Sequence, residues 1–85
     1  MKVLIPTSLR SYTGAASVDA SGATLGALLA DLDRRYPGIL FRMVDEQGRM
    51  RPHIRFFVDG EQVHSLSHPL TDAGEVVIMQ ALSGG

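Results

Sequence analysis

The chain has 85 residues, of which 45% are hydrophobic and 20% charged, and this length and composition suit a single small globular domain. Eight basic and nine acidic side chains give a net charge of −1, without the positive excess of nucleic-acid and anionic-membrane binders. The sequence has no cysteine, which excludes disulfides, a thiolate nucleophile and a cysteine-based zinc site. No stretch is apolar for long enough to be a signal-peptide core or a membrane span, so we expect a cytoplasmic protein without nucleic-acid or membrane partners.

The first twenty residues are typical of a β-hairpin. Residues 2–6 are aliphatic and β-branched, as in a strand, and Pro6 marks the end of that strand. Residues 11–14 indicate a turn, and residues 16–20 indicate a second, shorter strand.

Residues 25–35 carry the pattern of an amphipathic helix. Its apolar side chains recur at helical spacing: Leu25, Leu28, Leu29, Leu32 and Tyr36. Thr24 is a suitable N-cap, and a Pro-Gly pair ends the helix near Arg35. Asp31 pairs with Arg35 at i,i+4, and we expect both Asp31 and Asp33 to face solvent. Glycine at position 26 lowers the stability of the helix by about 1 kcal/mol relative to alanine. Close packing of the helix against a strand would explain why a glycine is present there.

The second half of the chain predicts three strands joined by loops. We expect a single turn or irregular segment at 39–44, followed by a polar loop at 45–52. A strand at 54–58 should end at the tight turn Asp59-Gly60 and return as a short strand at 62–66. A long turn at 67–74 then leads to a last strand at 75–82. One helix across one mixed sheet is the two-layer arrangement for these elements. If the first and last strands are parallel neighbours, the fold class is α+β, a β-grasp (ubiquitin-like) domain.

Alternation along two strands predicts which side chains face away from the helix. The side chains expected to face the helix are Val76, Ile78, Ile54, Phe56 and Val58. Phe57, Val77 and Met79 then lie together on the open face of the sheet. We interpret them, with Leu82, as a partner-docking patch, and the alternative is a dimer contact or ordinary surface.

The charged and titratable side chains give no sign of an enzyme site. Three arginines near the loop after the helix are interpreted as a solvated rim, with an acidic partner surface as the alternative: Arg49, Arg51 and Arg55. Three histidines lack ligand spacing, and we expect no metal site: His53, His64 and His68. No nucleophile-base arrangement and no phosphate-binding glycine loop is present, and the chain is too short for a deep cleft.

The sequence finishes with Gly84 and Gly85 directly after the last predicted strand. Glycine has no Cβ, so such a tail (residues 83–85, expected to be flexible) can enter a narrow channel and present its carboxylate to an adenylating active site. The alternative is a frayed end or a cloning remnant.

With these features, the chain resembles the MoaD/ThiS family of sulfur-carrier proteins over essentially its whole length. The similar segments are residues 70–78 with the terminal Gly84 and Gly85, residues 24–32 and residues 36–39. Residues 3–14 and 18–26 are most similar to one branch, the CysO-type carriers, which deliver sulfide to a PLP-dependent cysteine synthase.

The resemblance implies a protein co-substrate rather than an enzyme. An E1-like enzyme of the MoeB/ThiF type would use ATP to adenylate the Gly85 carboxylate, with Gly84 giving access. A sulfur donor would then form a thiocarboxylate, which a sulfur-accepting synthase consumes. The domain, residues 1–85, would bind no cofactor itself, and PLP would belong to the acceptor enzyme.

Three other functions remain open for the same sequence. The first is a ubiquitin-like modifier conjugated to lysines through Gly85, and the second is the small subunit of molybdopterin synthase. The third is a plain β-grasp binding module whose two terminal glycines have no chemical role.

Overall fold

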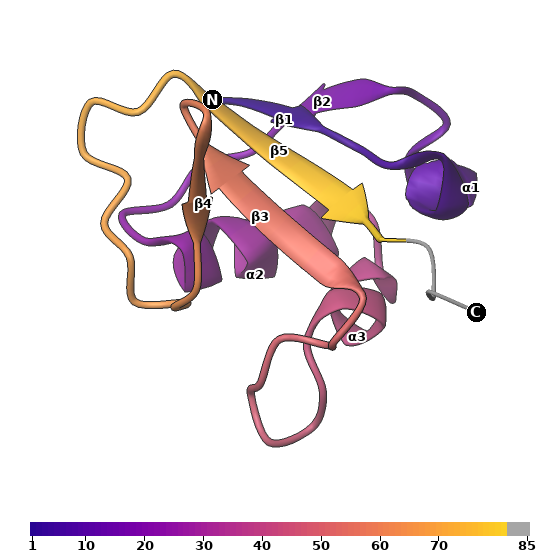
Figure 1. Cartoon of the computed structure of the whole chain (residues 1–85). Coiled ribbons are helices and arrows are strands. Elements are labelled where there is room, and N and C mark those ends of the chain that lie inside the picture. The colour runs from indigo at the N-terminus through magenta and orange to yellow at the C-terminus, as the bar shows by residue number, and fades with distance from the viewer. Residues whose placement is uncertain (82–85) are drawn as a thin grey trace.

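A computed structural model describes residues 1–81, whose five strands form one mixed sheet (Figure 1). The strands are β1 (Lys2–Leu4), β2 (Ser17–Asp19), β3 (Ile54–Val58), β4 (Glu61–Val63) and β5 (Glu75–Gln80). Their spatial order is β2-β1-β5-β3-β4, and β1 and β5 are parallel while every other pair is antiparallel. The last strand is therefore the central one, and the predicted N-terminal hairpin and parallel closure are confirmed.

One main helix, α2 (Leu25–Arg35), covers one face of this sheet (Figure 1). The Thr24 hydroxyl caps it by accepting a hydrogen bond from the Ala27 N–H at 3.2 Å. The helix buries its leucine stripe completely, and the strands supply the other side of the core from alternating positions: Leu25, Leu28, Leu29 and Leu32 meet Val3, Phe56, Val76 and Ile78. Burial of each such side chain stabilises the fold by about 1.5–3 kcal/mol. This arrangement is the predicted β-grasp fold.

The predicted turn at 11–14 is wrong, because the segment after β1 is helical. A 3-10 turn, η1 (Thr7–Leu9), runs into a short helix, α1 (Arg10–Thr13), which ends at Gly14 with φ of +69°. Leu9 is buried in the core and anchors this segment, although its polar neighbours give no helical periodicity. The single turn predicted at 39–44 is confirmed as α3 (Ile39–Met43).

The chain after β3 also differs from prediction. Asp59 and Gly60 form the expected tight turn, with positive φ angles of 48° and 88°. The returning strand is Glu61–Val63 rather than residues 62–66, because Leu66 leaves the sheet to meet the helix. The Gly26 N–H donates to the Leu66 carbonyl at 2.8 Å, so Gly26 packs against this connecting segment and not against a strand.

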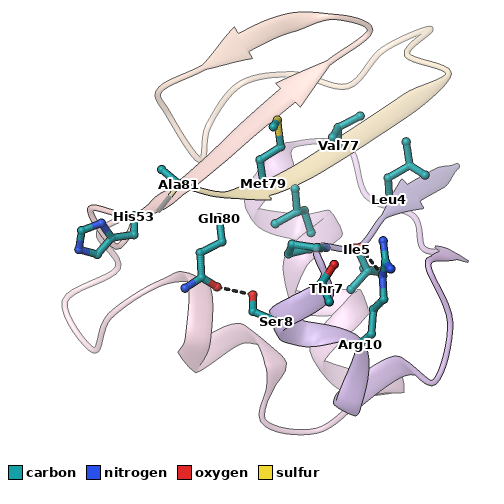
Figure 2. A pocket seen from close by; sticks show the side chains of 12 residues that line it. Leu4, Ile5, Thr7, Ser8, Arg10, His53, Val77, Met79, Gln80 and Ala81 are labelled. Atoms are coloured by element: carbon teal, nitrogen blue, oxygen red, sulfur yellow. Dashed lines mark hydrogen bonds between the residues drawn. The ribbon is translucent and has the colours of Figure 1, made fainter. Parts of the chain in front are cut away.

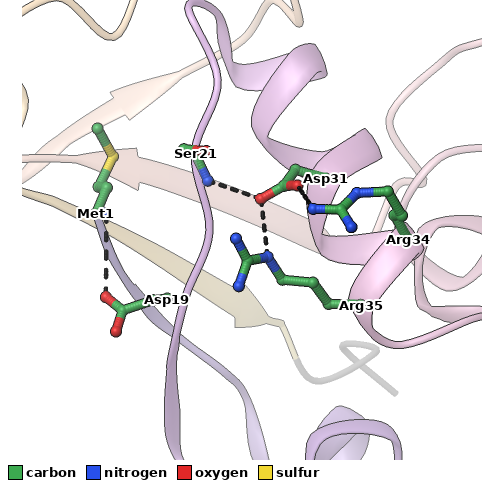
Figure 3. A network of polar contacts seen from close by, with 6 residues as sticks. All are labelled: Met1, Asp19, Ser21, Asp31, Arg34 and Arg35. Carbon is green, nitrogen blue, oxygen red and sulfur yellow. Dashed lines mark hydrogen bonds and ion pairs between the residues drawn. The ribbon is translucent and has the colours of Figure 1, made fainter.

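The two helix carboxylates do not simply face solvent, which corrects the prediction for Asp31 and Asp33. Asp31 accepts a hydrogen bond from the Ser21 N–H at 2.9 Å and pairs with Arg34 and Arg35 (Figure 3). The Ser21 hydrogen bond, followed by those from the arginines, lowers the Asp31 pKa to about 2. Asp33 accepts from two N–H groups at the start of α3. Both side chains thus tie loops to α2. Within residues 1–81, no helix is long and apolar enough to cross a membrane.

Candidate functional site

The described chain leaves the sheet at the end of its central strand. After Gln80, the N–H of Ala81 donates to the His53 carbonyl at 2.7 Å, which holds the last described residue beside the start of β3. We call this point, Gln80 and Ala81, the tail root. The predicted reactive residues Gly84 and Gly85, and Leu82 of the predicted patch, lie outside the described residues.

A groove opens beside the tail root, between the end of β5 and the segment that joins β1 to α1 (Figure 2). Its volume is about 810 Å³, and its walls combine backbone and side chains of both segments. Ser8 donates a hydrogen bond from its hydroxyl to the Gln80 side-chain oxygen and so links the two walls. Arg10 donates from Nε to the Ile5 carbonyl at 3.1 Å and carries its charge along the groove. His53 lines the other end.

The open face of the sheet carries the predicted apolar patch. Phe57 lies opposite Val77 in the β3–β5 register, and Leu4 lies opposite Val77 on the other side, so one apolar row crosses three strands. Met79 follows two residues along β5 with half of its surface exposed. The outward orientation of Phe57, Val77 and Met79 is confirmed, and Leu4 is an addition. Leu4 was missed because the strand order decides which residue flanks Val77. Val77 and Met79 also line the groove, so the patch reaches the tail root.

The structure separates the three arginines that the sequence groups together. Arg49 pairs with Asp45 of its own loop at 3.4 Å. Arg51 stacks over the Phe41 ring, with 4.7 Å between its guanidinium carbon and the ring centroid. Arg55 donates to the carbonyls of residues 52 and 54, and lies opposite Met79 in the sheet. Only Arg51 and Arg55 remain near the tail root, where Arg10 and Arg42 join them from other elements.

The three histidines lie in different parts of the fold. His53 lines the groove, His64 follows β4, and His68 accepts a hydrogen bond at its carbonyl from the N–H of Leu25. The described part of the chain contains no group of three His, Cys, Asp or Glu side chains that could hold a metal ion.

Taken together, the tail root lies at the end of the central strand, beside a groove, and an exposed apolar patch adjoins it. These features form one open surface at the last described residues of the chain.

The chain is similar to known proteins over nearly its whole length. The family model of the ThiS family matches residues 3–85. The sulfur carrier protein CysO of Mycobacterium tuberculosis is 39% identical over an alignment that covers 98% of this chain and 96% of that protein. Its crystal structure superposes with a TM-score of 0.88 at 38% identity, covering 95% of this chain and 98% of that one.

Two further solved structures show the range of this similarity. In the Amycolatopsis orientalis BexX/CysO complex, the matching chain gives a TM-score of 0.89 at 35% identity, with 99% of this chain and 98% of that chain covered. The small archaeal modifier protein 1 of Haloferax volcanii gives 0.79 at 26% identity, with coverage of 100% and 98%.

Proposed function

The chain belongs to the ThiS family, and from that premise we propose that it is a sulfur carrier whose C-terminal carboxylate is converted to a thiocarboxylate. The observation that carries the proposal is its end-to-end similarity to a named sulfur carrier protein, at 39% identity over 98% of the chain. The similarity includes the C-terminal region, because the family match extends to Gly85. Gly85 would carry the reactive group, and Gly84 would keep the approach to it narrow.

The chemistry needs an activating enzyme and a sulfur donor. A carboxylate is a poor electrophile, so an E1-like enzyme would let the Gly85 carboxylate attack the α-phosphorus of ATP, releasing pyrophosphate and forming an acyl adenylate. Hydrosulfide from a donor would then attack the acyl carbon, AMP would leave, and loss of a proton from sulfur would give the thiocarboxylate. Splitting the exchange into two steps avoids direct displacement of an oxide from a carboxylate. The carrier acts throughout as a co-substrate and binds neither ATP nor PLP itself.

The open-face patch would dock the partner enzymes. Phe57, Val77 and Met79 form a continuous apolar surface that reaches the tail root, so an enzyme that covers it is positioned to receive the tail. Aromatic and methionine side chains are enriched in interface cores, and methionine adapts to more than one partner. One patch would therefore serve successive enzymes.

Intact mass spectrometry tests the carrier chemistry directly. The chain is incubated with ATP, a cognate E1-like enzyme and a sulfur donor. We expect a mass gain equal to the replacement of one oxygen by sulfur, with no gain in a variant lacking Gly85. The deletion should leave the thermal stability unchanged, because the 18 buried core residues of the described part of the chain, residues 1–81, all lie at or before Ile78. A gain in the deleted variant, or none in the intact chain with an active enzyme, would contradict the proposal.

We propose that a PLP-dependent cysteine synthase accepts this sulfur and incorporates it into cysteine. The similarity to proteins named CysO supports this acceptor. Adding such a synthase and an O-activated serine to the thiocarboxylated chain should join the sulfur to the serine-derived carbon skeleton, with loss of the activating group. Hydrolysis of the remaining acyl–sulfur bond should then return the carrier to its original mass and release cysteine. Retention of sulfur by the carrier would point to a different acceptor.

Protein modification is a second candidate function, favoured by the similarity to a small archaeal modifier protein. The fold and the adenylation step would be the same, but the acyl adenylate would pass to a lysine of a target protein. Antibody detection of the chain in whole-cell extracts distinguishes the two functions. A modifier gives a ladder of covalent conjugates that is lost with Gly85, whereas a dedicated carrier gives a single band.

A further inference from the structure

The two ends of the sheet differ in charge, although the net charge of the chain is only −1. Arginines gather around the tail root: Arg10, Arg42, Arg51 and Arg55. Carboxylates gather where β5 begins: Asp59, Glu61, Asp72 and Glu75. The six residues of β5 separate these two ends by about 20 Å.

The arginines surround the tail root from four different segments: α1, α3, the loop before β3, and β3. Arg10 lines the groove described above, while Arg42 and Arg51 line a neighbouring groove. The two grooves share Ser8, His53 and Gln80, so they meet at the tail root. Arg55 completes the set from β3, opposite Met79. We call these four side chains the tail-root arginines.

None of the tail-root arginines forms an ion pair with a carboxylate of residues 1–81. The ion pairs of this part of the chain use the other cations, which are the N-terminal amine, Lys2, Arg34, Arg35 and Arg49. The tail-root arginines instead donate to uncharged oxygens: Arg10 to Ile5, Arg51 to Phe41, and Arg42 to the Tyr12 hydroxyl at 2.7 Å. Their charges are held in place but not neutralised.

Local contacts hold two of these charges beside aromatic side chains, of which Tyr12 is partly buried and Phe41 is exposed. The Tyr12 hydroxyl raises the pKa of Arg42 above its ordinary value. Arg51 lies over Phe41, whose ring is 58% exposed although it is large and apolar. Each guanidinium has five N–H donors and uses one or two here, so several remain available to a carboxylate. Arginine beside aromatic rings is the composition of interface hot spots.

A short tail brings this surface against any enzyme that receives it. Four residues follow Ala81, and four extended residues span at most about 14 Å. For Gly85 to reach a buried active site, the entrance of the channel must therefore lie close to the tail root. The tail-root arginines are then covered by the rim of that entrance, where an unpaired charge is costly to desolvate.

We propose that the activating enzyme carries acidic side chains around the entrance of its tail channel, and that the tail-root arginines bind them. This inference rests on the proposed function, since it assumes that Gly85 enters an enzyme. The carboxylates at the other end of the sheet would be repelled by the same acidic rim. The charge distribution of the carrier therefore orients it, tail first, before the apolar patch makes contact.

Charge reversal with a matched control tests the proposal. The double variant Arg10→Glu/Arg51→Glu is compared with Arg34→Glu/Arg49→Glu, which changes the net charge equally but away from the grooves. The measurement is kcat/KM for carrier-dependent ATP–pyrophosphate exchange by the E1-like enzyme, at about 0.05 M and about 0.5 M salt. Thermal melts establish that each variant is folded. If the charge-reversal variant does not fold, the neutral double variant Arg10→Gln/Arg51→Gln replaces it in the same measurement.

We expect the tail-root variant to lose at least about tenfold in kcat/KM at low salt, with a smaller loss at high salt and little loss in the control. Equal losses in both variants would overturn the proposal, because they would reflect net charge alone. An unchanged or faster tail-root variant would also overturn it, and a faster one would mean that the arginines hold the chain's own terminal carboxylate. Wild-type chain that supports no exchange at all would instead contradict the proposed function.

Discussion

The two faces of the sheet use the same strands for different purposes. Phe56 and Phe57 are adjacent in β3, yet Phe56 is completely buried under α2 while Phe57 lies half-buried on the open face. In β5 the same alternation places Val76 and Ile78 in the core and Val77 outside. A strand that is covered on one side only separates its residues in this way, so stability and docking can change independently.

Substitutions of the two phenylalanines test the difference between the two faces of the sheet most directly. Phe56→Ala should destabilise the fold by about 3–5 kcal/mol, because it opens a cavity beneath the helix. Phe57→Ala should lower the free energy of unfolding by only about 1 kcal/mol, which is the contribution of one cross-strand side-chain pair. The same substitution should raise the KM for adenylation about tenfold. Denaturant unfolding and ATP–pyrophosphate exchange measure the two effects. Equal destabilisation by both variants, or normal KM in a folded Phe57→Ala variant, would contradict the division between the faces.

A backbone contact, besides side-chain burial, positions α2 on the core face. A Cβ on Gly22 would lie 2.3 Å from the Leu28 nitrogen, and backbone atoms cannot move aside easily. Gly22→Ala should therefore destabilise the fold by about 1–3 kcal/mol or more. Gly26→Ala is the matched control, because its Cβ would stand 3.2 Å from the Leu66 carbonyl and its gain in helix propensity offsets the strain. Thermal melts that rank Gly26→Ala as the worse variant would refute this account of the contact.

The smallest expected effect concerns pH and is confined to the helix side of the molecule. The Asp31 pKa falls from 3.8 to about 2 in the folded chain, so its contribution to stability is complete above about pH 4 and is lost as the pH falls toward 2. Asp31→Asn should be less stable than the wild type at neutral pH, and most of the difference should be lost by pH 2, where the Asp31 carboxylate of the folded chain is about half protonated. Glu46→Gln, an exposed loop substitution, is the control for urea unfolding across that range. A difference as large at pH 2 as at neutral pH would show that the carboxylate charge is not the cause.

The pattern of leucines in residues 25–35 and the alternation in the strands predicted at 54–58 and 75–82 predicted the helix, the core row and the open-face patch correctly, although the last strand ends at Gln80 rather than at residue 82. Periodicity succeeds there because each element buries one regular face. It failed for residues 7–13, where a single buried side chain, Leu9, holds a short helical segment that has no regular face. It also failed for Asp33, whose role as a cap for α3 depends on where the chain turns after α2.

The sequence by itself determined the fold class, the core residues of α2, β3 and β5 and, through its resemblance to the MoaD/ThiS family, the expectation of a reactive Gly85. Tertiary structure alone decided what surrounds the tail root. Arg10 lies far from Arg42 and Arg51 in the chain, and the three have no common spacing. They line adjoining grooves because the last strand inserts between β1 and β3. Local patterns record which face of an element is buried, whereas a surface assembled from several elements depends on strand order, which no local pattern contains.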